Sequence, residues 1–242
     1  MIEILASITG SNGNASVISD GETFLQIDCG VSYKVLNRMM DFQMYRVHNA
    51  IITHGHSDHI AYASDFMRYG VKVWAKTRTW NAGFILGKNR TNLRTFEQGK
   101  QFEIGTFIIK PFPVVHTNRD GTECENSGFL IYSKITKERL LWVTDTAYIE
   151  YKFPALDYIA IECSYFDIDD YSNELEYINK YVEQRRLKSH LSYNRCVKFL
   201  KMQDLSKCKW IKLLHISKSQ GEIADKMKEE MEKEFYGKEI LI

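Results

Sequence analysis

The chain has 242 residues, of which 32 are Lys or Arg and 31 are Asp or Glu, so its formal net charge is +1. Hydrophobic residues make up 44% and charged residues 26%, a balance that fits a globular protein and excludes disordered and collagen-like chains. No apolar run approaches the roughly 20 residues of a membrane span. The N-terminus lacks the pattern of a signal peptide. Five scattered cysteines without a CxxC pair favour free thiols in a reducing compartment.

Short β-compatible segments, separated by turn signals, dominate the first two thirds of the chain. Apolar residues at helical spacing predict a helix over Asp58–Tyr69, ended by Gly70, and a shorter helix near Trp80–Leu86. The predicted strands are Ile2–Thr9, Ala15–Ile18, Thr23–Asp28, Asn49–Thr53, Val71–Trp74, Phe107–Val115, Gly128–Tyr132, Leu140–Thr144 and Tyr158–Glu162.

From Asp170 onwards the pattern changes to helices. These are predicted over Asp170–Arg185, Ser192–Met202 and Ser219–Phe235, with one strand over Trp210–His215. Strands and helices in both halves predict a layered α/β protein in which sheets pack between helices. No linker or repeat interrupts the chain, so we expect a single domain over residues 1–242, located in the cytoplasm.

The segment THGHSDH, residues 53–59, is the strongest chemical signal, because three of the seven histidines of the chain fall within six positions. Alternate side chains of an extended segment point the same way, so His54 and His56 can bind one ion together. Asp58 and His59 follow on the next turn and can reach a second ion. Imidazole and carboxylate are preferred ligands of zinc, and of manganese or iron with more oxygen. The alternative is a polar loop in which histidines cluster by chance.

Three further polar residues stand at the ends of predicted strands. His116 follows PFPVV, Asp145 ends LLWVTD and His215 follows WIKLL. Each alone is more typical of a turn or a cap. Together with the first cluster they give seven candidate ligands, a number that suits two ions that share one carboxylate, with a hydroxide between them.

These motifs resemble those of the metallo-β-lactamase fold superfamily. The HxHxDH signature stands at residues 54–59, and the later motifs match His116, Asp145 and His215 in the same order. Asp28 in LQIDCG matches the acidic residue of the first motif, which in the family supports the site from behind the ligands. The resemblance implies a four-layer αβ/βα sandwich, two packed mixed sheets flanked by helices, with the metals at one edge of the sheets.

The resemblance also implies two divalent cations, Zn²⁺ or Mn²⁺, as cofactors. It assigns His54, His56 and His116 to the first metal, Asp58, His59 and His215 to the second, and Asp145 to both. The fourth ligand of the signature is His59 rather than Arg, and no Cys lies near the last motif. Both features are evidence against β-lactam hydrolysis.

Finer features resemble the YycJ (WalJ) subgroup and the RNase Z-like phosphodiesterases. The opening SITGSNGNA is similar to the SGSxGN start of the subgroup, and HISKSQGE after the last motif also fits it. Glu162 in IECSY and His190 in SHLSYN resemble a Glu and a His that these enzymes place between the last two motifs. The sequence departs from many relatives where TNRD follows His116. Only 69 residues separate Asp145 from His215, too few for a β-CASP insertion.

The resemblance implies Asp58, His190 and Glu162 as catalytic residues. A leaving phosphodiester oxygen needs a proton, and His190, oriented by the Glu162 carboxylate, is the predicted general acid. The alternative for His190 is a structural residue at the start of a helix capped by Ser192.

Local charge gives a second, weaker indication of the substrate. Residues 180–218 hold 11 Lys or Arg against 2 Asp or Glu, and such a basic stretch would attract a phosphate backbone. The alternative is a solvated helix face balanced by the acidic C-terminal helix. The predicted substrate-binding residues are Arg185, Arg186, Lys188 and Arg195.

The favoured function is therefore a DNA-cleaving phosphodiesterase, of the type of a YycJ-like 5′–3′ exonuclease. The alternative enzyme is an ester, thioester or small cyclic phosphodiester hydrolase with the same metal site. A metal protein without activity is a third alternative. Cys124, expected in the loop after His116, is a minor candidate for an approach to the metals.

Overall fold

The computed structural model describes residues 1–82, 91–167, 186–216 and 221–242. The contacts within the chain define two compact units. The first comprises Met1–Pro113 and Ser127–Glu138, and the second Val114–Asn126 and Arg139–Ile242. Strands β8 (Phe107–Thr117) and β9 (Glu123–Ser133) each contain residues of both units.

A six-stranded mixed sheet forms the greater part of the first unit. Its strands follow one another in chain order: β1 (Glu3–Ile8), β2 (Ala15–Ser19), β3 (Phe24–Ile27), β4 (Val47–Ile51), β5 (Lys72–Ala75) and β6 (Leu93–Thr95). The first two pairings are antiparallel and the next three are parallel. The parallel strands therefore end at one common edge, which is where α/β sheets build their sites.

Short helices bury the apolar face of this sheet. They are α1 (Tyr33–Met39), the 3₁₀ turn η1 (Met44–Arg46), α2 (Ser57–Ile60), α3 (Ala63–Arg68) and α4 (Thr77–Ala82). Leu36 of α1 and Phe66 of α3 are fully buried in one cluster with Val17 and Val73 of the sheet. Burial of each such side chain contributes about 1.5–3 kcal/mol, so this core fixes the strand ends that carry the polar residues.

The second sheet has seven strands in the order β13-β12-β11-β10-β9-β8-β7. Besides β8 and β9 it contains β7 (Phe102–Ile104), β10 (Arg139–Val143), β11 (Tyr158–Glu162), β12 (Trp210–Leu214) and β13 (Glu239–Leu241). Strands β10 to β13 are parallel. Every residue of β11 is buried, as expected for a central strand of a parallel sheet.

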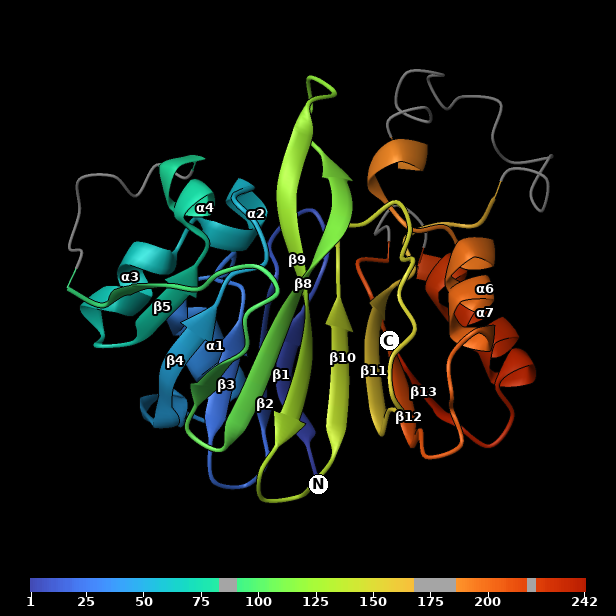
Figure 1. Cartoon of the computed structure of the whole chain (residues 1–242), viewed down its shortest axis with the longest axis horizontal. Helices are drawn as coiled ribbons and strands as arrows, with labels where there is room; N and C mark the ends of the chain where they lie inside the picture. The colour runs from blue at the N-terminus through green and yellow to red at the C-terminus, as the bar shows by residue number, and fades with distance from the viewer. Residues whose placement is uncertain (83–90, 168–185, 217–220) are drawn as a thin grey trace. The chain divides into compact units, whose positions relative to one another are not determined.

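Two helices, α6 (Tyr193–Lys201) and α7 (Gly221–Glu234), lie beside β11–β13 in the second unit (Figure 1). Ser192 caps the N-terminus of helix α6, because its hydroxyl accepts a hydrogen bond from the amide of Arg195. The N-cap indicated by the sequence is therefore present. Among the described residues, no helix has the length and apolar character needed to cross a bilayer.

The prediction of an α/β protein with two mixed sheets is confirmed, but the single helix predicted over Asp58–Tyr69 is wrong. It is interrupted between α2 and α3. The carbonyl of Asp58 accepts the amide of Asn14 at 2.7 Å, and the amide of Tyr62 donates to Cys29 at 2.9 Å. These main-chain groups bond to a neighbouring loop, so the helical hydrogen-bond ladder does not continue through them.

Five described elements were not predicted: the strands β6, β7 and β13, the helix α1 and the 3₁₀ turn η1. The three strands have only three residues each, too few for an alternating pattern to be recognised. The predicted helix Asp170–Arg185 lies outside the described residues, as do positions 83–86 of the helix predicted near Trp80. Cys124 lies within β9 and not in a loop, which corrects its expected place.

Candidate metal centre

The edge of the six-stranded sheet brings Asp28 and Thr53 together. Asp28 follows β3 and Thr53 follows β4, and Ile27 pairs with Ile51 in the parallel register. The amide of Asp28 donates to Ile51 at 2.8 Å, and the amide of Thr53 donates to the Asp28 carboxylate at 2.8 Å. The strand register alone thus places an aspartate beside the start of the histidine segment.

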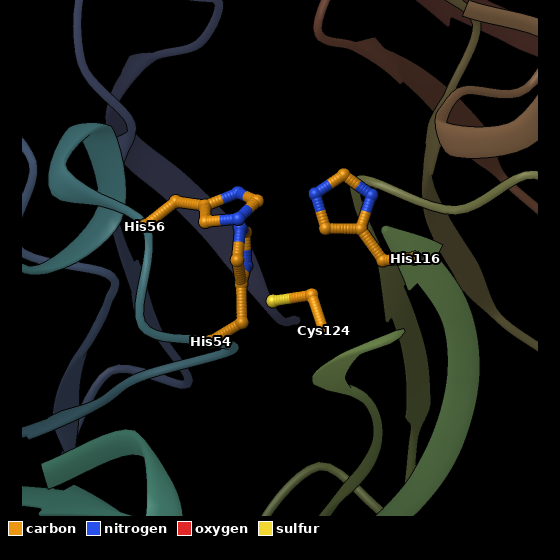
Figure 2. A group of neighbouring side chains, drawn as sticks. All are labelled: His54, His56, His116 and Cys124. Atoms are coloured by element: carbon orange, nitrogen blue, oxygen red, sulfur yellow. The ribbon is translucent and has the colours of Figure 1, made fainter. Parts of the chain in front are cut away.

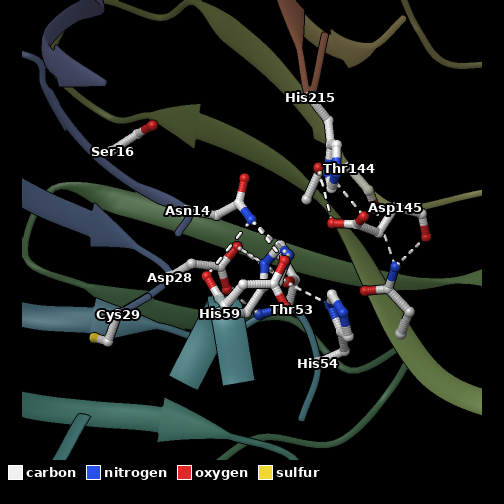
Figure 3. Close-up of polar contacts among 12 residues, drawn as sticks. Asn14, Ser16, Asp28, Cys29, Thr53, His54, His59, Thr144, Asp145 and His215 are labelled. Atoms are coloured by element: carbon white, nitrogen blue, oxygen red, sulfur yellow. Dashed lines mark hydrogen bonds and ion pairs between the residues drawn. The ribbon is translucent and has the colours of Figure 1, made fainter. Parts of the chain in front are cut away.

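The buried Asp28 carboxylate is the centre of a hydrogen-bond network (Figure 3). It accepts the Thr53 hydroxyl at 2.9 Å and the Nδ1 proton of His59 at 2.8 Å. Burial raises the pKa of the Asp28 carboxyl, although the adjacent His59 and the bonds from Thr53 act in the opposite direction. When a carboxylate accepts the hydrogen bond of one imidazole nitrogen, it fixes the orientation of the ring. The other ring nitrogen then carries the lone pair that can bind a metal, as in many metal sites.

Asn14 fixes the opposite side of the same ring. Its carbonyl oxygen accepts the amide of Gly10 at 2.8 Å, which orients the side-chain amide. The Asn14 nitrogen therefore donates to Nε2 of His59 at 2.9 Å. Asp58 also lies close, with Oδ2 3.6 Å from this Nε2. His59 is thus held as the tautomer whose Nε2 offers a lone pair.

His54 and His56 lie on the loop between β4 and α2 (Figure 2). The ring of His54 is 4.6 Å from that of His56 and 4.1 Å from that of His59, measured between centroids. His54 and His59 are fully buried. These three imidazoles and Asp58 are candidate metal ligands, and we call them the first ligand group.

Gly30 allows the loop after Asp28 to pack closely against the histidine segment. A Cβ at this position would lie 1.6 Å from the carbonyl oxygen of Asp58. The amide of Gly30 donates to Asn14 at 2.8 Å, and the amide of Cys29 donates to His59 at 2.7 Å. The backbone of the first ligand group is therefore fixed by main-chain bonds as well as by Asp28.

A second set of candidate metal ligands, which we call the second ligand group, lies at the ends of three parallel strands in the second unit. Asp145 follows β10, Glu162 ends β11 and His215 follows β12. Strand register pairs Val143 with Ile161 and Glu162 with Leu214, so the three side chains start from the same edge. His190 joins them from the segment before α6.

Donor atoms of Asp145, Glu162, His190 and His215 all lie within 4.8 Å of one another. The His190 Nδ1 lies 2.6 Å from Glu162 and 3.5 Å from Asp145, and the His215 Nδ1 lies 2.9 Å from Asp145. Asp145, Glu162 and His215 are buried. Two imidazoles and two carboxylates gathered in this way fit a divalent cation by the chemistry of their donor atoms.

Main-chain bonds hold His190 over the end of β11. The amide of Ser164 donates to Leu191 at 2.9 Å, and the amide of Tyr193 donates to Tyr165 at 2.8 Å. The segment around His190 therefore runs beside the segment that follows Glu162.

His116 and Cys124 lie side by side on β8 and β9 (Figure 2). The Nδ1 of His116 donates to the carbonyl of Ser189 at 2.9 Å. A donor of His116 and the sulfur of Cys124 lie within 4.8 Å of each other. The sequence made Cys124 only a minor candidate for an approach to the metals and placed it in the loop after His116, whereas it lies within β9.

The four predicted substrate-binding residues differ from one another in their contacts within the protein. The guanidinium of Arg186 lies 4.2 Å from the ring centroid of Tyr165, Lys188 is exposed, and Arg185 lies outside the described residues. Arg195 donates to the carbonyls of Ala147 and Leu187 at 3.1 and 3.0 Å. Arg195 therefore holds the backbone near Asp145, and contact of any of these residues with substrate stays a prediction.

Asp28, Asp145 and His215 adopt left-handed backbone conformations, with φ of 61°, 52° and 56°. Each stands directly at a strand end, where the chain turns sharply. Conformations of this kind are uncommon for residues other than glycine and cluster at functional sites.

The two ligand groups have the residues and order of a known family. A family model for the beta-lactamase superfamily domain matches residues 24–207. The chain belongs to the beta-lactamase superfamily. The superfamily predicted from the motifs is therefore confirmed, and the match includes most of the predicted ligands.

Individual relatives agree with this assignment. The chain is 29% identical over 152 residues to the exodeoxyribonuclease YycJ of Bacillus anthracis, a match that covers 60% of the chain and 54% of the relative. The chain thus spans about half the length of this curated relative. The family and this relative support a metal-dependent hydrolase.

Solved structures show that the fold is that of the metallo-β-lactamases. The fold protein YhfI of Bacillus subtilis superposes with a TM-score of 0.67 at 13% identity, covering 100% of this chain and 95% of its own. Unliganded yeast PDE1 gives a TM-score of 0.68 at 13% identity, covering 100% of this chain and 97% of its own.

Proposed function

We propose that the protein is a phosphodiesterase that hydrolyses nucleic acid, with DNA as its expected substrate. The observation that carries the proposal is the pairing of His190 with the buried Glu162 at 2.6 Å, in one group with Asp145 and His215. Hydrolysis of a phosphodiester releases an alkoxide, a strongly basic leaving group that needs a proton, whereas hydrolysis of a thioester releases a stable thiolate. A carboxylate-held imidazole is suited to supply that proton.

Within the second ligand group, we assign Glu162 and His190 to proton transfer and not to the metals. We expect two divalent cations, Zn²⁺ or Mn²⁺. The residues that would hold them are His54, His56, Asp58, His59, His116, Asp145 and His215. When bound, such ions polarise a phosphoryl oxygen and lower the pKa of a water molecule. The assignment of each residue to one of the two ions rests on the order of the motifs in the family.

The proposed role of His190 as a general acid depends on which of its two ring nitrogens can donate a proton to the leaving oxygen. Its Nδ1 donates to Glu162 at 2.6 Å, so Nε2 is the atom from which a protonated ring gives its proton to the leaving oxygen. Glu162 is a positioning residue in this scheme, since it contacts His190 and the amide of Thr146. Arg186 and Lys188 would contribute positive charge that attracts the phosphate chain.

The exodeoxyribonuclease relative supports DNA as the substrate. The test is cleavage of end-labelled single-stranded DNA and RNA of one sequence by chelated protein reloaded with Zn²⁺ or Mn²⁺. Bis(p-nitrophenyl) phosphate and a thioester serve as parallel substrates. The matched variants are His190→Ala and His48→Ala, because His48 is an exposed histidine outside both ligand groups.

We expect metal-dependent DNA cleavage that falls roughly 100- to 10,000-fold in His190→Ala and is unchanged in His48→Ala. Turnover of the thioester without cleavage of any phosphodiester would overturn the proposal in favour of the alternative hydrolase. Cleavage of RNA alone would keep the phosphodiesterase and correct the substrate.

A further inference from the structure

Strands β8 and β9 direct Cys124 and His116 to the same side of their hairpin. Along β9, Cys124 and Asn126 are buried while Glu123 and Glu125 are exposed, and along β8 His116 is buried while Val115 is exposed. Successive side chains of a strand alternate between its faces. Cys124 therefore shares its face with Asn126 and lies beside His116 (Figure 2).

The orientation of His116 is fixed. Its Nδ1 donates to the Ser189 carbonyl at 2.9 Å, and a carbonyl can only accept. The ring lone pair is consequently on Nε2. The neighbouring Thr117 hydroxyl also bonds to the Ser189 hydroxyl at 2.5 Å, so the ring is held in the manner typical of a metal-binding histidine.

The shared face of β9 meets the turn that carries Asp145. The Asn126 amide donates to the carbonyls of Thr144 and Asp145 at 2.9 and 2.6 Å. Cys124, two residues earlier on the same face, is 8% exposed. The Cys124 sulfur thus lies within 4.8 Å of a ring nitrogen of His116, and no other described cysteine belongs to such a group.

We propose that Cys124 is an additional metal ligand, which binds the same ion as His116. This inference rests on the proposed function, because it needs a metal at His116. Two ligands of one tetrahedral zinc, at about 2.3 Å for sulfur and 2.1 Å for nitrogen, lie about 3.5 Å apart. The observed separation of at most 4.8 Å exceeds this value by at most about 1.3 Å.

Binding breaks the S–H bond and forms a sulfur–metal bond, and the proton passes to solvent. A thiolate is a softer ligand than imidazole or carboxylate. Its presence shifts the preference of the site towards zinc or cadmium and away from manganese.

The test is optical. Chelated protein is titrated with Co²⁺, and bound cobalt is counted by elemental analysis after desalting. We expect a sulfur-to-cobalt charge-transfer band in the near ultraviolet. The band should be lost in Cys124→Ser and Cys124→Ala and kept in Cys208→Ser. Cys208 is a matched control because it is a buried cysteine of the same unit whose thiol donates to the Trp210 carbonyl.

The wild-type spectrum decides the question even where a variant fails to fold. Bound cobalt without the band, or a band that survives in Cys124→Ser, would overturn the thiolate ligand and leave the phosphodiesterase proposal intact. Absence of bound cobalt would overturn both proposals together.

Discussion

The Nδ1 of His190 lies 2.6 Å from one oxygen of Glu162, and the other oxygen of the same carboxylate accepts the amide of Thr146 at 2.6 Å. Glu162 is fully buried at the end of a central strand. The carboxylate therefore links the imidazole to the turn that carries Asp145. We therefore expect a substitution of Glu162 to affect both His190 and this turn.

Glu162→Gln tests this link. The amide keeps the shape of the side chain but no longer offers a charged acceptor to His190, so we expect DNA cleavage to fall roughly 10- to 100-fold. In a His190→Ala background the same change should have little further effect, because Glu162 acts through His190. Losses that simply multiply in the double variant would contradict a positioning role.

Asp28→Asn should weaken metal binding. The Asp28 carboxylate accepts bonds from Thr53 and from Nδ1 of His59, and an amide can satisfy only part of these donors. We expect metal affinity to drop about 10- to 100-fold, measured by competition with a chromophoric chelator. Asp120→Asn, a change in the exposed β8–β9 turn, should bind metal like the wild type. Equal affinities for Asp28→Asn and wild type would show that the network is not needed.

Gly30→Ala should disrupt the first ligand group through the backbone. The new methyl group would meet the Asp58 carbonyl at 1.6 Å, and neither main chain can move without breaking bonds to Asn14 and Cys29. We expect destabilisation of about 3 kcal/mol, measured by urea unfolding. Gly121→Ala, where a Cβ meets nothing within 4 Å but φ is +84°, should cost only about 1 kcal/mol.

A smaller effect of Gly30→Ala than of Gly121→Ala would show that the loop adjusts. The contact between residue 30 and Asp58 would then not be a constraint on the fold.

Asp20 predicts a pH dependence of stability in the first unit. Burial acts to raise the pKa of its carboxyl, but hydrogen bonds from Ser133, Thr106 and the amides of Thr23 and Glu22 outweigh this and lower the pKa. A lowered pKa in the folded state stabilises the protein above the unfolded value of 3.8. This stabilisation is lost as the pH falls through the folded pKa.

Asp20→Asn should therefore lower the free energy of unfolding by about 2 kcal/mol near neutral pH. The difference from wild type should shrink at about pH 3, as followed by urea unfolding at a series of pH values. Asp41→Asn, at an exposed aspartate, should follow the wild type. A difference for Asp20→Asn that grows at low pH would contradict the assignment.

The sequence predicted the strand ends well because parallel strands place their following residues at one edge. Asp28, Asp145 and His215 could be recognised because each interrupts an apolar run. The buried strand Tyr158–Glu162 was predicted with the bounds that the structure gives. The order of the family motifs was recognisable because their polar residues stand at the ends of these apolar runs.

The sequence could not predict features that depend on contacts between distant segments. The break after α2 follows from bonds of Asn14 and Cys29 to the histidine segment, and nothing in the helical spacing indicates them. The direction of Cys124 depends on the length of β9, which extends five residues beyond the predicted start at Gly128 towards the N-terminus. The role of Arg195 depends on its bond to the carbonyl of Ala147, which lies 48 residues away in the chain.

The left-handed backbone at Asp28, Asp145 and His215 has a consequence for how the protein evolves. Glycine would relieve roughly 1 kcal/mol of strain at each of these positions. At Asp28, however, glycine would remove the acceptor of the buried Thr53 hydroxyl and of the Nδ1 proton of His59, at a cost of about 1–3 kcal/mol for each buried donor. We therefore expect Asp28 to persist even in a descendant that has lost its activity, because the same carboxylate also stabilises the fold.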